Sequence, residues 1–456
     1  MNFKTTGILA LVLIIGVVAV VLLDKQDEKK EEQQELEEQI LNIDKDQVSE
    51  IILQPSGIHC VKDSAEWDIV APVETDGDKS SIDALANMFD WAKIDRVISS
   101  DPSEYSTFGL DPAQGRLILV HDRGTDTIYV GDKSPTGSFV FARQSGSPEV
   151  FLTTTTLKTN VEKSLFDLRD KSVLGFEASQ VRSVDLDIPD GEFTVSRIGG
   201  IWKLTSPVEA DADRSEVDNI LNRMSSERTR EFVEESPDNL GSYGLAPPAY
   251  HIDVYLGENR AQKTLLVGDA TDGRYYAKDA SRSPVFLVDS AFVNILNTSL
   301  YDLRNKDLAD FSTSEVNKFE LEFSGQTIVC EKDTAGTWMV LEPELRKAKS
   351  WKMSSITREA SQLEVVQFVD DNPTSLSKYG LASPQVNARF YKDDQVLLDV
   401  SLGNTVDENV YAKVADAESV YLVESNVLDA WQPELEDISE APQDPEEQPS
   451  DVSEAQ

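Results

Sequence analysis

A period of 135 or 136 residues recurs through most of this 456-residue chain. Three kinds of landmark share it: the tryptophans Trp67, Trp202 and Trp338, the glycines Gly109, Gly244 and Gly380, and the triplets that begin at Val150, Val285 and Val420. Independent landmarks with one spacing indicate repeated copies of one domain. The sequence therefore predicts three tandem copies, at residues 48–175, 176–311 and 312–432.

Hydropathy patterns predict the contents of each copy. Residues 181–186 alternate apolar and polar, as a half-buried strand does. Apolar residues at 217, 220, 221 and 224 follow helical spacing, and Ser215 (Ser80 or Ser81 in the first copy) is a candidate N-cap. A second helix is predicted over 291–303. The fold class is α+β, with a mostly antiparallel sheet and about two helices per copy.

The repeated landmarks have structural explanations. A tryptophan in mid-strand anchors a core, although three at one period would also suit a ladder for stacking carbohydrate. Each repeated glycine lies in a Phe/Tyr-Gly-Leu segment that leads to a proline, which suggests a turn with positive φ at Gly109, Gly244 and Gly380. Gly-Asp pairs at 131–132 and 268–269, with Gly403-Asn404, are predicted to be hairpin turns.

A Leu-Arg-Asp/Asn-Lys motif ends copies one and two but is absent from copy three. Its arginines are Arg169 and Arg304, 135 residues apart. Because the motif occurs only where another copy follows, we expect the two arginines to tie adjacent copies together through carboxylates or carbonyls. A docking spot for a partner is the alternative.

The N-terminus has the pattern of a membrane anchor. After a stub at residues 1–4, residues 5–23 carry no charge, which is long enough to span the hydrocarbon core of a bilayer. A cleavable signal peptide is the alternative. Residues 24–47, rich in Glu, Gln and Lys, predict a charged helical stalk. We expect a single-pass protein of the bacterial cytoplasmic membrane with its body on the extracytoplasmic side.

The net charge of −41 limits the partners of this chain. Nucleic-acid binding and docking on anionic lipid through a basic patch both need a positive footprint. Residues 433–456 hold nine acidic residues, four prolines and no Lys or Arg, which predicts a disordered acidic tail. The acidic body suits either a saline environment or a surface for basic partners.

Motifs for catalysis, cofactors or metals are absent from the sequence. His59, His121 and His251 occupy different places in their copies, and the carboxylate-rich loops do not match a calcium loop. Cys60 and Cys330 are two periods apart, and Val195 stands at the matching position of copy two. We therefore expect two buried free thiols in separate copies. The sequence predicts no catalytic, cofactor-binding or metal residue.

Taken together, these motifs resemble the bacterial "domain of unknown function 4340" family, over about residues 48–430. The resemblance implies a membrane-anchored envelope protein with no established activity. Members are often encoded beside ABC-type exporter subunits similar to those of gliding-motility systems, which implies transporter subunits as partners. The expected function is a non-enzymatic extracytoplasmic scaffold or exporter accessory. A binding module for envelope polysaccharide or peptidoglycan is the alternative.

Overall fold

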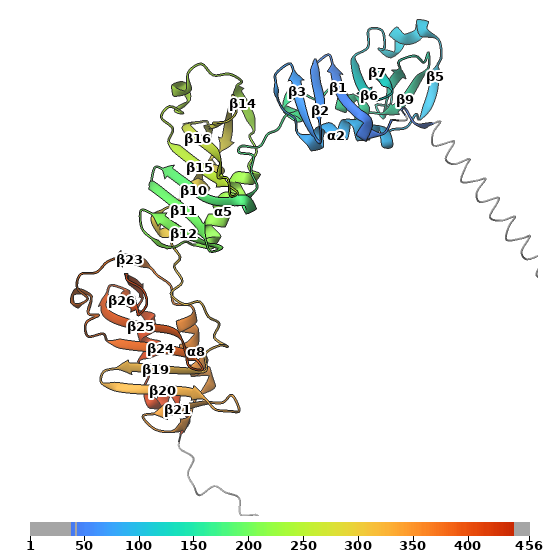
Figure 1. The fold of residues 1–456 in the computed structure, drawn as a ribbon. Coiled ribbons are helices and arrows are strands. Elements are labelled where there is room, and N and C mark those ends of the chain that lie inside the picture. The colour runs from blue at the N-terminus through green and yellow to red at the C-terminus, as the bar shows by residue number, and fades with distance from the viewer. Residues whose placement is uncertain (1–37, 42, 442–456) are drawn as a thin grey trace, which may run out of the picture. The chain divides into compact units, whose positions relative to one another are not determined.

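Three nine-stranded sheets follow one another along the chain (Figure 1). The computed structural model describes residues 38–41 and 43–441. The predicted α+β class, with three tandem copies built on antiparallel sheets, is confirmed for these residues. The predicted membrane helix at residues 5–23 lies outside the described part of the chain.

Every sheet has the same strand order. Two four-stranded meanders meet at the centre, where the first strand pairs with the sixth, and the fifth strand lies at the far edge beside the ninth. Sheet one consists of β1 (Val48–Gln54), β2 (Ile58–Asp63), β3 (Glu66–Ala71), β4 (Thr75–Asp76), β5 (Arg96–Ser99), β6 (Gly115–His121), β7 (Gly124–Lys133), β8 (Phe139–Gln144) and β9 (Val150–Thr154). Sheet two consists of β10 (Val181–Ile188), β11 (Gly191–Ile198), β12 (Ile201–Ser206), β13 (Ala210–Asp211), β14 (Glu231–Glu234), β15 (Tyr250–Leu256), β16 (Ala261–Thr271), β17 (Arg274–Asp279) and β18 (Val285–Asp289). Sheet three consists of β19 (Lys318–Phe323), β20 (Gln326–Lys332), β21 (Trp338–Glu342), β22 (Arg346–Lys347), β23 (Gln367–Asp370), β24 (Val386–Lys392), β25 (Gln395–Val406), β26 (Asn409–Val414) and β27 (Val420–Glu424).

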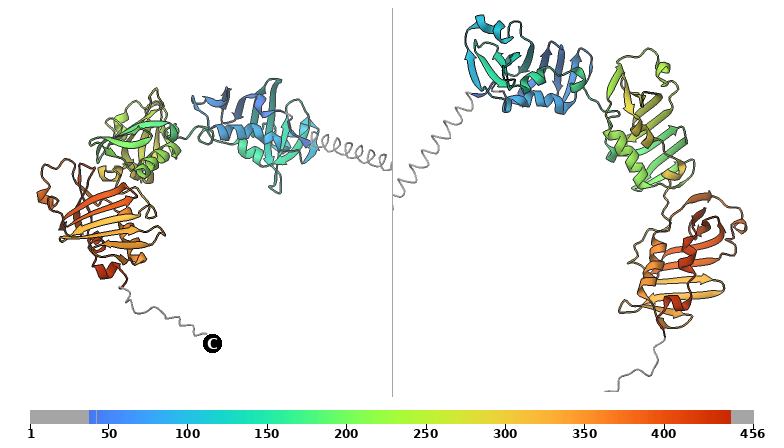
Figure 2. Two further views of the ribbon diagram at one scale, coloured as in Figure 1. Left: turned by 60° about the horizontal axis from the view of Figure 1, so that its bottom comes forward. Right: turned by 180° about the vertical axis from the view of Figure 1, so that it is seen from behind.

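Each sheet is accompanied by one longer helix and two short ones, seen from two further sides in Figure 2. The longer helices are α2 (Lys79–Asn87), α5 (Arg214–Ser226) and α8 (Ser350–Ser361). The short ones are α3 (Thr156–Val161), α4 (Leu165–Leu168), α6 (Ser290–Leu296), α7 (Leu300–Leu303), α9 (Asn426–Trp431) and α10 (Leu435–Ile438). The helix predicted over 291–303 is thus divided into α6 and α7, because Ser299 starts a new capping box with Asp302.

The caps of the longer helices differ from the sequence prediction. The carboxylate of Asp213, and not Ser215, caps α5, where it accepts hydrogen bonds from the amides of Ser215 and Glu216. Asp78 caps α2, where its carboxylate accepts a hydrogen bond from the amide of Ser81. A carboxylate is favoured there because the helix N-terminus carries partial positive charge as well as unpaired N–H groups. The predicted apolar face of α5 is buried at Val217, Ile220, Leu221 and Met224.

The first and third copies extend beyond the ranges expected from the sequence. Ile40 and Leu41, which the sequence places in the stalk, are 3% and 4% exposed and pack in the core of sheet one. Residues 435–438, which the sequence places in the disordered tail, form α10 with Ile438 fully buried. Both stretches are strongly acidic in composition. Their average composition therefore predicts solvent exposure, although a few of their apolar side chains are buried in the core.

Packing divides the chain into two compact units. One consists of the residues up to Ser172 together with Arg228–Phe232, and the other of Val173–Glu227 together with Val233 onward. Sheets two and three therefore belong to one unit. A short stretch of the copy-two sequence, which contains Phe232, belongs to the unit of sheet one.

Candidate functional site

The three repeated tryptophans lie in the cores. Their exposed fractions are 1% for Trp67, 4% for Trp202 and 8% for Trp338. The indole N–H groups of Trp67 and Trp202 donate to Asp83 and Asp218, at 2.8 and 3.0 Å. A cation also covers each ring, from Lys62, Arg197 or Lys332, at 5.6, 5.3 and 5.1 Å from the ring centroid. Rings buried to this degree offer no free face for stacking a sugar.

The three repeated glycines each end a 3-10 helix in the left-handed conformation. The helices are Pro102–Phe108, Leu240–Tyr243 and Ser377–Tyr379, and φ at Gly109, Gly244 and Gly380 is 67°, 65° and 76°. The aromatic residue before each glycine packs on an aromatic residue of the eighth strand, with ring centroids 4.8 to 5.0 Å apart. The contact between the two aromatic rings thus holds the loop that contains the glycine against its sheet.

The Gly-Asp pairs are not hairpin turns, as the sequence suggests, but lie inside long strands. Gly268 and Asp269 are in β16, at a bulge between Val267 and Ala270. A Cβ on Gly268 would overlap the carbonyl oxygen of Tyr243, and the same holds for Gly131 and Gly403 against their own loops. Glycine is therefore required because two backbones meet there, and the sequence alone could not distinguish this from a turn.

Arg304, one of the two predicted junction residues, lies between sheets two and three. It follows α7 and is 5% exposed. Its two terminal nitrogens donate to the carboxylate of Asp371 at 2.8 and 3.1 Å, and its Cζ lies 3.7 Å from the ring centroid of Phe368. We call Arg304, Phe368 and Asp371 the Arg304 junction. A bidentate pair on top of an aromatic stack is the geometry that arginine provides and lysine does not.

Arg169 has the matching environment in the first unit. It follows α4, is 2% exposed, and its Cζ lies 3.5 Å from the ring centroid of Phe232. The ring of Phe166 meets Phe232 edge-on at 6.1 Å, as Tyr301 meets Phe368 at 6.0 Å in the second unit. Phe232 and Phe368 are 136 residues apart, so the ring that receives the arginine follows the repeat too.

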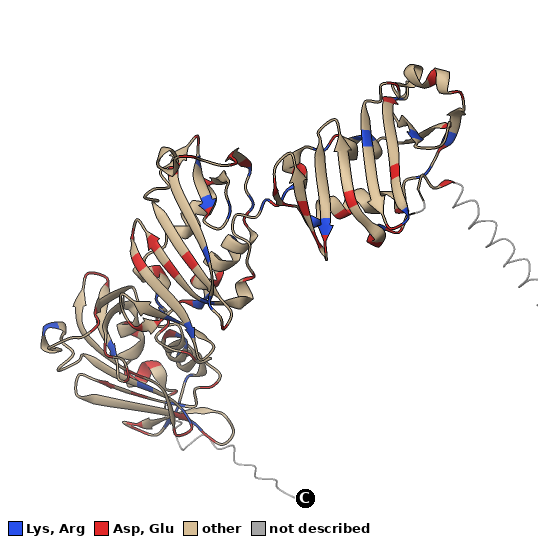
Figure 3. Cartoon of the chain, turned by 45° about the horizontal axis from the view of Figure 1, so that its top comes forward, with Lys and Arg blue, Asp and Glu red and all other residues tan. Residues whose placement is uncertain are grey.

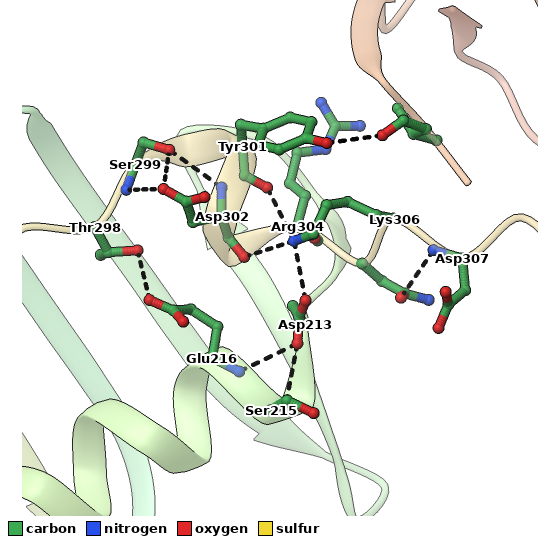
Figure 4. Close-up of polar contacts among 12 residues, drawn as sticks. Asp213, Ser215, Glu216, Thr298, Ser299, Tyr301, Asp302, Arg304, Lys306 and Asp307 are labelled. Atoms are coloured by element: carbon green, nitrogen blue, oxygen red, sulfur yellow. Dashed lines mark hydrogen bonds and ion pairs between the residues drawn. The ribbon is translucent and has the colours of Figure 1, made fainter. Parts of the chain in front are cut away.

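The lysine of the same motif closes the short helix. Lys306 donates to the carbonyl oxygens of Asp302 and Arg304 at 3.0 and 3.1 Å, and forms an ion pair of 2.9 Å with Asp213 (Figure 4). Lys171 donates to three carbonyl oxygens around α4. The last carbonyls of a helix lack partners within the helix, and an ammonium group can satisfy several of them. Burial raises the pKa of Asp213, but Lys306 and the capped amides outweigh it, so the pKa lies below its ordinary value.

Copy three keeps this element but changes its chemistry. Ser439 forms the same isolated bridge, to Ala348, that Arg304 forms to Ala212 and Arg169 to Gly77. Lys349 stands where the other copies have the capping aspartate, and its ammonium donates to the Glu436 carbonyl at 2.6 Å. In copy three the cation that donates to the short helix is thus Lys349, at the start of α8, whereas in copy two it is Lys306, after the short helix. Among the described residues, copy three therefore has Ser439, and not an arginine, at the position that matches Arg304.

A hollow of about 650 Å³ lies beside the Arg304 junction. Its lining includes Asp211, Asp307 and Glu418 as well as Arg304 and Asp371. Burial raises the pKa of Asp371, but its bonds to Arg304 and Ser419 and the charge of Arg304 have the larger combined effect, so the pKa lies below 3.8. Asp371 is thus ionised near neutral pH, where its carboxylate accepts hydrogen bonds from Arg304.

The other titratable groups do not gather into one site. Each histidine meets a carboxylate of its own sheet, His59 with Glu50 at 2.7 Å, His121 with Asp126 at 3.1 Å and His251 with Asp253 at 3.5 Å. Over residues 38–41 and 43–441, no group of three or more His, Cys, Asp or Glu side chains could hold a metal ion. In the same ranges no helix combines the length and the apolar character needed to cross a membrane.

The sequence indicated Arg169 and Arg304, with carboxylates or carbonyls of the next copy as their partners, but not which residues they contact. Phe232 and Phe368 keep the 136-residue spacing, so a search for further residues at that period could have found them. Asp371 lies 67 residues beyond Arg304 in a loop rich in polar residues, and no pattern there distinguishes it from its acidic neighbour Asp370.

Comparison with known proteins places the chain in a family. The model of one family, described as "Domain of unknown function (DUF4340)", matches residues 67–197, 202–374 and 347–442. No curated protein and no solved structure gives a match. The three family matches together cover well over half of the sequence and include the repeated tryptophans, both junction arginines and α10. The chain therefore belongs to the family of the domain of unknown function DUF4340.

Proposed function

We propose that this chain is a non-enzymatic scaffold or accessory protein of an ABC-type exporter complex in the bacterial envelope. In this proposal residues 5–23 tether it to the cytoplasmic membrane, and the three copies extend on the extracytoplasmic side. The copies would present a series of surfaces to the partner subunits. The anchor rests on the uncharged run in the sequence, and the exporter context rests on the family resemblance.

The Arg304 junction is the observation that carries the proposal. Its charged groups are engaged with one another, at 2.8 and 3.1 Å, and its aromatic ring lies under the guanidinium. Groups held in this way support the arrangement of two copies rather than the turnover of a substrate. A protein whose most distinctive repeated polar residues join one copy to the next is suited to a scaffold.

Affinity isolation of the full chain from gently solubilised native membranes tests the proposal. We expect transporter subunits to be recovered with the chain in fixed stoichiometry. A matched variant without residues 1–23 should recover much less, because tethering raises the local concentration of membrane partners. Recovery of the chain alone would overturn the proposal, and recovery with glycan fragments would favour the polysaccharide-binding alternative.

The side of the membrane is tested separately by protease treatment. In cells whose outer membrane alone is permeabilised, an extracytoplasmic body should be degraded while a cytoplasmic marker protein remains intact. A body that is degraded only after the cytoplasmic membrane is lysed would place it in the cytoplasm and overturn the proposed location.

A further inference from the structure

We propose that sheet two carries a binding site for a small phosphate-type oxyanion, formed by Arg182, Arg197 and Arg260. The three arginines line one hollow of about 600 Å³ together with Ser183, Ser196, Glu258 and the turn glycines Gly199, Gly200 and Gly257. This volume is in the range of small-molecule sites. The site lies within copy two and does not depend on the scaffold function proposed above.

Three elements of sheet two bring the arginines together. Ser183 of β10 and Ser196 of β11 are paired in register, so the adjoining Arg182 and Arg197 lie at the same end of these strands. The turn between β15 and β16 supplies Arg260, and the amide of Gly257 in that turn donates to the Gln180 carbonyl at 2.9 Å. The three arginines therefore line one hollow at this end of the sheet.

Neighbouring residues position the three arginines, and one carboxylate of the lining pairs with Arg182. Arg260 donates to the hydroxyl of the buried Ser183 at 3.3 Å, and Arg197 donates to the Gly200 carbonyl at 3.4 Å. Arg182 forms an ion pair with Glu258 at 2.9 Å, but that carboxylate is 91% exposed and can move aside at little cost. Three cations face one carboxylate, so the hollow is positively charged.

The same place in copy three is closed by internal bonds. One period later, Asn317 stands for Arg182 and Lys332 for Arg197. Asn317 exchanges two hydrogen bonds with Asp393 of the turn, at 2.6 and 2.8 Å, and Lys332 donates to the Val316 carbonyl at 2.7 Å. In copy one the corresponding turn carries both Asp122 and Arg123, with Arg123 Nε 3.9 Å from Asp122 Oδ1, and Lys62 stands one period before Arg197. The repeat fold therefore does not require the arginine-lined hollow, because copy three has the same strand order but fills this place with Asn317, Asp393 and Lys332.

The charge of the whole chain limits what can bind there. The net charge is −41, and Figure 3 shows acidic residues on all three sheets. At physiological salt this negative field is screened over about 8 Å, so a long polyanion or an anionic membrane would meet repulsion beyond the hollow. A compact oxyanion avoids that repulsion, and guanidinium groups match phosphate oxygens through paired N–H donors. The ligand class that fits is a small soluble phosphate or phosphate ester.

Calorimetric titration of the full chain in detergent with pyrophosphate and inorganic phosphate, at constant ionic strength, tests the inference. We expect saturable binding, with at least one of the two probes bound at millimolar concentration or below. The double variant R182Q/R260Q should bind about tenfold or more weakly, because charged hydrogen bonds are lost. The matched control K332Q, at the closed position of copy three, should bind as the unsubstituted chain does.

Two results would overturn the inference. One is the absence of saturable binding of both probes at millimolar concentration. The other is equal binding by the unsubstituted chain and R182Q/R260Q, once circular dichroism has shown that both are folded. Competition by a short-chain phosphatidic acid distinguishes the source of the phosphate. If phosphatidic acid displaces pyrophosphate no more strongly than inorganic phosphate does, the ligand is a soluble phosphate. If phosphatidic acid displaces it much more strongly, and this effect is lost in R182Q/R260Q, the ligand is a lipid headgroup and the soluble ligand is overturned.

Discussion

Arg304 contacts Asp371 through both of its terminal nitrogens, at 2.8 and 3.1 Å, across the step from sheet two to sheet three. The Arg304 side chain is 6% exposed, whereas the Asp371 side chain is 36% exposed. The pair therefore lies at the edge of a buried contact, and each of its members can be removed to measure what it contributes.

Arg304→Ala should lower the free energy of unfolding of the unit that contains sheets two and three by about 2 kcal/mol. A fully buried ion pair would cost more to break, but solvent reaches Asp371 and reduces the effect. Urea unfolding of the full chain measures the loss. Arg214→Ala is the matched control, because Arg214 forms an exposed pair with Asp218, and it should change stability by about 0.5 kcal/mol or less.

A double-mutant cycle of Arg304→Ala with Asp371→Asn should give a coupling energy of about 1 kcal/mol or more. We also expect small-angle scattering to change for Arg304→Ala if the junction restricts how the two sheets move. A coupling energy of zero together with unchanged scattering would show that the arginine does not tie the copies.

Acid should weaken the Arg304 junction. The pKa of Asp371 is below 3.8 in the folded protein, so its ionised form stabilises the fold above pH of about 3.8, and that contribution disappears as pH falls through the folded pKa. Arg304→Ala should remove part of this dependence, because the pKa of Asp371 then rises. Unfolding free energies measured from about pH 5 to pH 2 test this. Parallel curves for the two proteins would contradict it.

Gly268→Ala should destabilise sheet two by about 3 kcal/mol, because its Cβ would overlap the Tyr243 carbonyl oxygen and force the two backbones apart. Gly273→Ala is the matched control. At Gly273 φ is 77° and nothing lies within 4 Å of a Cβ, so only the left-handed backbone costs energy, about 1 kcal/mol. Thermal unfolding of the two variants compares them, and equal losses would mean that the close approach does not matter.

Trp202→Phe should lower stability by about 2 kcal/mol, since it leaves a cavity and removes the 3.0 Å bond to Asp218. Trp351, which is 66% exposed, is the control, and Trp351→Phe should stay within about 0.5 kcal/mol. Chemical unfolding followed by circular dichroism measures both. A Trp202→Phe protein with full stability would reopen a binding role for the repeated tryptophans.

Cys60 and Cys330 should resist maleimide in the native protein at pH 8. Burial raises the pKa of both thiols to about 12, and a thiolate is needed for the reaction. Both should react once the chain is unfolded. Because the folded pKa is raised, the stability that the two neutral thiols contribute is present below about pH 9 and is lost as pH rises toward 12. Rapid labelling of the native chain would contradict the burial.

Local apolar patterns predicted the elements whose burial follows from their own sequence. Alternation in β10 and the apolar spacing of α5 are local, and each reports directly which face of the element is buried. Apolar residues within acidic surroundings were missed at Leu41 and Ile438, because the average composition of those stretches predicts solvent exposure. Burial there depends on the neighbouring core and not on the local sequence.

The sequence by itself determined the number of copies, their strand-rich class and the positions of the core tryptophans, because a period and an alternation are properties of spacing along the chain. Only the tertiary structure decided that Gly268 lies under Tyr243 and that Asp371, rather than Asp370, receives Arg304. These pairs are far apart in sequence, and their contact depends on how strands and loops pack. Spacing along the chain carries no information about which of two adjacent carboxylates faces the arginine.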